Sequence, residues 1–141
     1  MNDTRNSHGG GEDDNLIRTS RSPDWSVREQ ACLDMSGHLS NPNVVRRITE
    51  LLDDPDIAVQ VTAAHVLARR GGTQGLSAVL DTLGQRIDDP DADHIAYKLQ
   101  ELQGLEELPI LERARSILTD TRSDAVRLGV AEIEKLFGHY A

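Results

Sequence analysis

The chain has 141 residues, a net charge of −9 and only 3% aromatic residues. This length predicts a single domain, and a core built from Leu, Val, Ile and Ala favours helices packed on helices. The negative charge argues against free-standing DNA or RNA binding, because phosphate contacts need a basic surface. The single cysteine, Cys32, excludes an intrachain disulfide, and no apolar run is long enough to span a membrane, so we expect a cytoplasmic protein.

The N-terminal residues 1–13 are polar and Gly-rich, which predicts a disordered tail. Residues 14–141 are expected to form one domain, because helical patterns of apolar residues follow one another along the whole segment. The first pattern, at 14–20, is short. Strong patterns follow at 23–36, 44–52, 54–72, 73–87, 91–103, 108–118 and 123–137.

The segment 54–72 carries the clearest helix signal. It opens with Asp54-Pro55-Asp56, in which proline suits a first helical turn and either aspartate can cap free backbone N–H groups. Apolar residues then cover more than half of the helical wheel, which predicts a helix buried on more than one side. Gly71-Gly72 is expected to end this helix.

The helix at 23–36 carries the only cysteine of the chain. We expect Val27, Ala31 and Met35 on its buried side, with Trp25 and Cys32 on a flank. No phosphate loop or basic cluster surrounds Cys32 in the sequence, so we interpret this residue as part of the packing and not as a nucleophile.

Similar turn phrases open several of the helices and recur at spacings of 32, 35 and 33 residues. A period in this range, with two helices per unit, points to an α-solenoid. The four phrases are Ser22-Pro23-Asp24, Asp54-Pro55-Asp56, Asp89-Pro90-Asp91 and Arg122-Ser123-Asp124.

Two of the copies continue as Pro23-Asp24-x-x-Val27-Arg28-x-x-Ala31 and Pro55-Asp56-x-x-Val59-Gln60-x-x-Ala63-Ala64-x-x-Leu67. In these phrases the chain resembles the HEAT-repeat family, in particular the short bacterial HEAT-like, armadillo-type proteins, over roughly residues 22–138. The resemblance implies an all-α fold, a short right-handed α-solenoid of about 3.5–4 HEAT-like helix pairs. It also implies that the second helix of each pair lines the concave face, and that the protein binds other proteins and is not an enzyme.

Carboxylates gather in the turns between the two helices of each repeat. Because equivalent turns of a solenoid stack along one edge, we expect these carboxylates to form a negative ridge. They cap helices and aid solubility, or they receive Arg and Lys side chains from a basic partner, and both roles can hold at once. The candidate residues are Asp53, Asp54, Asp56, Asp88, Asp89, Asp91 and Asp93, with Asp120 and Asp124 in the last such turn.

A mixed polar stripe is expected on the second helices. Thr62, His65 and Arg69 are three and four residues apart and therefore share one side of their helix. This side is an ordinary solvated face or a protein-binding surface. The repeat spacing places beside it Gln30 and Leu33 from one neighbouring helix, and Tyr97, Gln100 and Glu101 from the other.

The sequence predicts no catalytic residue, no cofactor and no metal centre. Asp89-x-Asp91-x-Asp93 resembles the start of a calcium loop, but His94 and Gln100 stand where such a loop needs Gly and Glu. We interpret this segment as a helix start rich in capping residues, with a weak surface cation site as the alternative.

These features favour a non-enzymatic protein-binding module. By analogy with small acidic inhibitors, our sharper hypothesis is a bacterial immunity or antitoxin-type protein that neutralises a basic, nuclease-like toxin through its acidic or concave surface. The alternatives are a HEAT-like scaffold or regulatory subunit, such as those that resemble phycobilin lyase subunits, and a nucleic-acid-binding protein of the kind found among HEAT-like DNA glycosylases.

Overall fold

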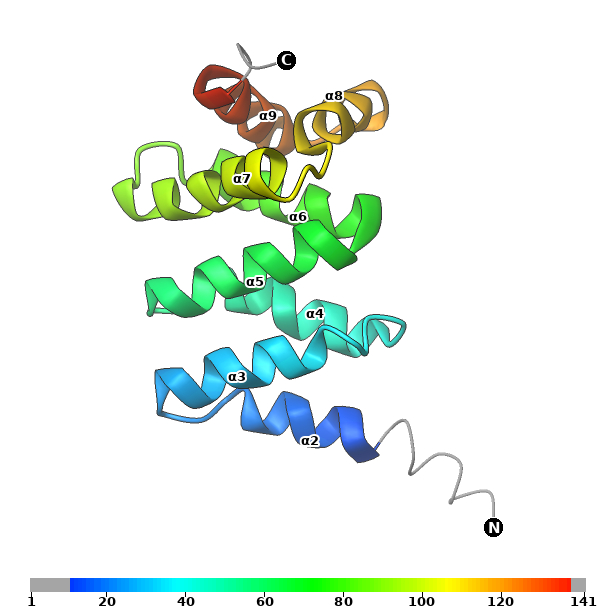
Figure 1. The fold of residues 1–141 in the computed structure, drawn as a ribbon, viewed down its shortest axis with the longest axis vertical. Coiled ribbons are helices and arrows are strands. Elements are labelled where there is room, and N and C mark those ends of the chain that lie inside the picture. Colours follow the sequence, from blue (N-terminus) through cyan, green and yellow to red (C-terminus); the bar gives the residue numbers. More distant parts are fainter. Residues whose placement is uncertain (1–10, 138–141) are drawn as a thin grey trace.

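The computed structural model describes residues 11–137, and within this range the chain is helical without strands. The helices stack along the longest axis of the molecule, with α2 at one end and α8 and α9 at the other (Figure 1). The expected all-α solenoid is therefore confirmed. The elements are α2 (Glu12–Thr19), α3 (Trp25–Met35), α4 (Pro42–Leu51), α5 (Ile57–Arg70), α6 (Gly72–Gln85), the 3-10 turn η2 (Pro90–Ala92), α7 (Asp93–Leu105), α8 (Ile110–Asp120) and α9 (Asp124–Phe137).

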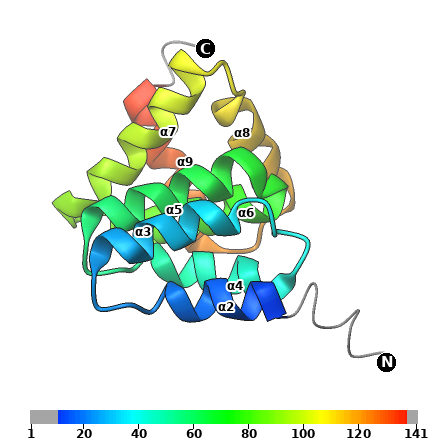
Figure 2. The same ribbon diagram turned by 60° about the horizontal axis from the view of Figure 1, so that its bottom comes forward.

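The helices form two layers. The second helices α3, α5 and α7 lie side by side in one layer, and α4 and α6 lie behind them (Figures 1 and 2). The turns that join α2 to α3, α4 to α5 and α6 to α7 stack on one side of the molecule, at the left in Figure 1. The chain thus presents one face made of second helices and one edge made of turns.

Capping side chains explain where these helices begin. Asp24, Asn41 and Asp56 each accept a hydrogen bond from the backbone N–H two residues later, at the starts of α3, α4 and α5. Such bonds satisfy the free donors of a first helical turn. At the other end of α5, Gly72 has φ +66°, a left-handed conformation that suits glycine, and α6 starts at once. The predicted stop at Gly71-Gly72 is confirmed.

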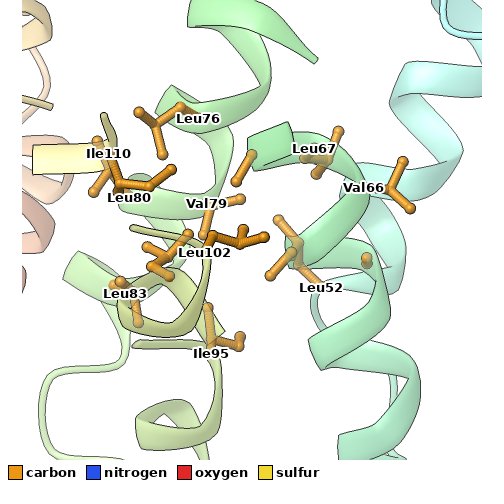
Figure 3. Packing of buried hydrophobic residues seen from close by; sticks show 14 of the residues in the cluster. Leu52, Val66, Leu67, Leu76, Val79, Leu80, Leu83, Ile95, Leu102 and Ile110 are labelled. Carbon is orange, nitrogen blue, oxygen red and sulfur yellow. The ribbon is translucent and has the colours of Figure 1, made fainter. Parts of the chain in front are cut away.

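The core is aliphatic, as expected from the small number of aromatic residues. Leu, Val, Ile and Ala side chains from successive repeats form one continuous cluster. Figure 3 shows part of it, in which Leu52 at the end of α4 meets the core together with Leu102 of α7 and Val79 of α6. Apolar side chains from adjacent repeats therefore share one core, which is how a solenoid stabilises repeats that are too small to fold alone.

The expected buried side of α3 is corrected in one respect. Ala31 and Met35 are buried as predicted, and Cys32 is fully buried with them, but Val27 is exposed. The equivalent Val59 of α5 is fully buried. The difference arises because α5 has a second helix on each side, whereas α3 has only α5 beside it.

Helix α2 closes the N-terminal end of the stack. It begins at Glu12, inside the segment 1–13 that we expected to be a tail, and residues 1–10 of that segment lie outside the described residues. The buried carboxylate of Asp13 accepts a hydrogen bond from Asn41 at 2.8 Å and lies 2.8 Å from Nδ1 of His38. Arg47 of α4 donates to the hydroxyl and the carbonyl of Ser20. These contacts fix α2 against the following repeat.

The last repeat departs from the regular stack. Helix α9 packs principally against α6, a first helix, and less against α7. Glycines allow the two backbones to approach closely, since a Cβ on Gly84 would clash with the backbone of Ala125, and one on Gly129 with the backbone of Leu80. The fourth repeat is therefore shifted relative to the path of the first three.

Candidate functional site

The turn edge consists of the turns at 20–24, 52–56 and 86–91, which contain most of the carboxylates that the sequence suggests as a site. The structure divides these carboxylates into two groups. Some hold the repeats together, and others face solvent. Only the second group is free to meet a partner.

Asp54 belongs to the structural group. Its carboxylate is buried and forms a two-point ion pair with Arg28 of α3, with Nε–Oδ2 at 2.8 Å and Nη2–Oδ1 at 3.0 Å. The bond to Asp54 is also the main reason that the pKa of Arg28 is raised. Because Arg28 lies one repeat earlier, this pair joins two repeats and leaves no carboxylate oxygen facing outward.

Arg86 forms the next link along the edge. Its guanidinium donates to the carbonyl of Leu52 and to Gln60, and it pairs with Asp89 at 3.0 Å. Asp89 also accepts the backbone N–H of Asp91, and that bond together with Arg86 lowers the pKa of the Asp89 carboxyl. Asp89 is thus a cap and an ion-pair partner within the chain.

The remaining carboxylates face solvent. Asp53, Asp88, Asp91 and Asp93 are exposed, and Asp56 is half-buried as the cap of α5. Asp53 lies 3.8 Å from Arg86, while no ion pair of Asp88, Asp91 or Asp93 occurs within residues 11–137. The first and fourth turns each carry an exposed arginine, Arg21 and Arg122, so the negative charge is greatest at the second and third turns.

The remaining acidic candidates are the aspartates of the fourth turn, at 120–124, and the alternative cation site at 89–93. Asp120 and Asp124 are exposed, and Asp124 pairs with Arg127 one helical turn later. No group of three metal-binding side chains occurs in the described part of the chain, so Asp89, Asp91 and Asp93 do not converge there.

The second-helix face contains a hollow of about 440 Å³ that crosses three repeats. Thr62 and His65 of α5 line it, together with Glu29 and Leu33 of α3 and Lys98 of α7. The hydroxyl of Thr62 donates to Glu29 at 2.7 Å, which joins α3 to α5 across the floor. The hollow therefore combines apolar, hydroxyl and charged side chains in a small area.

His65 lies at the centre of this face. Partial burial and then the nearby Lys98 lower the pKa of its imidazole, so the neutral form is favoured. Lys98 is paired with Glu101 at 2.8 Å, and this contact lowers the pKa of the Glu101 carboxyl. A neutral imidazole can donate and accept hydrogen bonds at once, which suits contact with polar groups of a partner.

The other candidates on the second helices occupy different places. Arg69 forms an ion pair with Glu106, beyond the end of α7. Tyr97 is exposed, whereas Gln100 lines a separate hollow between α7 and α9 with Phe137. The structure thus brings Thr62, His65 and the expected neighbour Leu33 into one hollow and adds Glu29 and Lys98, which the sequence reasoning missed. The other four candidates, Arg69, Tyr97, Gln100 and Glu101, lie outside its lining.

Comparison with protein families identifies the fold from sequence as well. A family model described as HEAT repeats matches residues 13–103, about two thirds of the chain. The chain belongs to the HEAT-repeat family. No curated protein and no solved structure gives a match to it.

HEAT repeats generally mediate protein–protein interaction and typically serve as non-enzymatic scaffolds. Two further properties of this HEAT array concern its cysteine and the length of its helices. Burial raises the pKa of the Cys32 thiol to about 12, so the thiolate needed for nucleophilic attack does not form near neutral pH. None of the described helices has the length and apolar character required to cross a membrane.

The period of the HEAT array would have revealed one of the missed residues. Glu29 precedes Thr62 by 33 residues, close to the spacing between turn phrases, so the two fall on neighbouring second helices. Lys98 was harder to place, because the third turn phrase follows the second by 35 residues whereas the second follows the first by 32, so the third copy is out of step with the others.

Proposed function

We propose that this HEAT array is a protein-binding module whose partner is a basic protein domain. The observation that carries the proposal is the group of exposed carboxylates at the second and third turns, Asp53, Asp88 and Asp91, where the one arginine, Arg86, is already bound to Asp89, Gln60 and the carbonyl of Leu52. Carboxylates of this kind steer and pair with Arg and Lys side chains. The adjacent second-helix face, with its exposed Trp25 and Tyr97, adds the aromatic contacts common at interfaces.

Within this class we propose an inhibitor of the immunity or antitoxin type, which neutralises a basic, nuclease-like toxin by covering its substrate site. The support is the combination of a small acidic chain with a family whose members bind proteins. A nuclease must itself be basic where it meets nucleic acid, so an acidic edge can occupy the same surface.

The experiment is capture of the tagged chain's partner from a lysate of the encoding organism, at low and at high salt, followed by mass spectrometry. We expect one basic protein in stoichiometric amount, lost at high salt. The triple variant Asp53→Lys, Asp88→Lys, Asp91→Lys should not capture it, whereas Glu12→Lys, Asp14→Lys, Glu112→Lys, with the same change of charge elsewhere, should. A captured acidic protein, or equal capture by both variants, would contradict the proposal.

A further inference from the structure

We propose that the hollow between the α6–α7 turn and α9 is the anchor point of the basic partner and receives one of its arginine or lysine side chains. This inference rests on the proposed function and assigns its main contact to one place. The hollow has a volume of about 700 Å³ and is lined by Ile87, Asp88 and Asp89 of the turn and by Leu128 of α9.

The exposed aliphatic side chains are the unusual feature. Ile87 is 39% exposed and Leu128 is 50% exposed. The turn phrase of the preceding repeat gives a direct comparison, because Leu52 stands where Ile87 stands, one residue before Asp-Asp-Pro-Asp, and Leu52 is fully buried. An apolar side chain that the regular repeat covers is therefore left open in the third repeat.

The packing of α9 accounts for this opening. In the preceding repeat Leu52 lies inside the continuous core, with Leu102 of the next second helix, α7, near it (Figure 3). The next second helix, α9, is held against α6 by the close approaches at Gly84 and Gly129. Leu128 of α9 and residues of the third turn line the hollow that remains between them.

Charge selects the occupant. Arg86, the cation in the wall, is already engaged by Asp89, Gln60 and the carbonyl of Leu52. Arg127 of α9 turns to Asp124 and the carbonyl of Thr121. Asp88 remains exposed beside the two aliphatic side chains. An arginine or lysine side chain fits both the apolar and the acidic part of the hollow. Its aliphatic stem covers Ile87 and Leu128, and its cation reaches the carboxylate of Asp88.

The test uses the ¹⁵N-labelled full chain and three short synthetic peptides, with alternating Arg-Leu, Arg-Ser and Glu-Leu sequences. We expect the Arg-Leu and Arg-Ser peptides to bind and to shift the amide signals of Ile87, Asp88 and Leu128, and the Glu-Leu peptide not to bind. Leu128→Asn and Asp88→Asn should each weaken the binding of the Arg-Leu peptide by about fivefold. The matched controls Leu105→Asn and Asp14→Asn, at exposed positions on α7 and α2, should leave it unchanged.

Several outcomes would overturn the inference. These are binding of the Glu-Leu peptide as tight as that of the arginine peptides, shifts confined to other surfaces, no binding, or a dimer of the chain that Leu128→Asn dissociates, which would assign the hollow to a second copy. The two proposals also fail separately. A basic partner captured equally by wild type and Leu128→Asn, but lost from the triple lysine variant, would leave the proposed function standing and reject the hollow as its anchor.

Discussion

The junction between the second and third repeats differs from the junction between the third and fourth. The turn phrases of the second and third repeats, Asp54-Pro55-Asp56 and Asp89-Pro90-Asp91, are nevertheless similar. At the first junction, α7 continues the layer of α3 and α5, and Leu52 is fully buried. At the second junction, α9 moves onto α6, and Ile87 is left 39% exposed. The comparison teaches that the turn phrase sets where a helix begins, while the packing of the next repeat decides whether the turn becomes core or surface.

The polar contacts follow the same division. Asp54 in the second turn is buried against Arg28 of the preceding repeat, whereas Asp89 in the third pairs with Arg86 three residues before it. The first contact joins repeats and the second is local. The match to the HEAT-repeat model ends at residue 103, before α8 and α9, which agrees with the change in packing.

The strongest test of the comparison substitutes the two equivalent aliphatic residues. Leu52→Ala should lower the free energy of unfolding by about 3 kcal/mol, because it leaves a cavity in a closed core. Ile87→Ala should lower it by less than about 1 kcal/mol, because the side chain is already partly in solvent. Urea denaturation of both variants measures the difference, and equal losses would show that the two junctions are closed alike.

The close approach of α6 and α9 gives the next largest effect. Gly84→Ala should destabilise the chain by about 2 kcal/mol, because the new methyl group would force the two backbones apart. Gly104→Ala in α7 is the control, since its methyl group would meet no atom within 4 Å, and it should be neutral or stabilising by about 0.5 kcal/mol. Thermal unfolding followed by circular dichroism compares them. A Gly84→Ala variant as stable as Gly104→Ala would be incompatible with this packing.

A smaller difference is expected between the two turn aspartates. Asp54→Asn should cost about 1.5 kcal/mol, since it removes the charge from a buried hydrogen-bonded pair with Arg28. Asp89→Asn should cost less than Asp54→Asn, because its pair with Arg86 is partly in solvent. The order of the two values, measured by urea denaturation, is the prediction, and the reverse order would refute the division into structural and local contacts.

The smallest effect concerns His65, in the regular part of the array. Its pKa is lowered by burial and by Lys98, so the folded chain binds this proton less readily than the unfolded chain. Stability should therefore fall as the pH drops below the ordinary histidine value of about 6.5, and this loss should end below the folded pKa. His65→Gln should remove that part of the pH dependence. In an NMR titration the His65 midpoint should lie below 6.5, and Lys98→Met should raise it.

Much of the fold was predictable from sequence, because its signals are local. Pro55 with its flanking aspartates and Gly71-Gly72 mark where a helix starts and stops, whatever packs against it. The exposure of Val27 was not predictable, since it depends on the lack of a further second helix beside α3. Gly84 and Gly129 carried the signal for the shifted α9, but a glycine in a helix indicates close approach without naming the helix that approaches.

The candidate site was harder to predict, because the exposure of its residues depends on how neighbouring repeats pack and not on local sequence signals. The aspartates of the second and third turns look alike in sequence, yet Asp54 is buried and its equivalent Asp89 is half-buried, because Asp54 pairs with Arg28 of the preceding repeat while Asp89 pairs with Arg86 of its own turn. Ile87 and Leu128 had no sequence signal as surface residues, since aliphatic residues at helix spacing predict core.

The most direct test of the central claim is NMR mapping of the captured basic partner on the ¹⁵N-labelled chain at low salt. The predicted result is a set of shifted amides at the second and third turns, including Asp53, Asp88 and Asp91, together with Leu128 of α9. Shifts confined to the first-helix layer, or no shifts on addition of the partner, would contradict the claim that this edge of the HEAT array binds a basic protein.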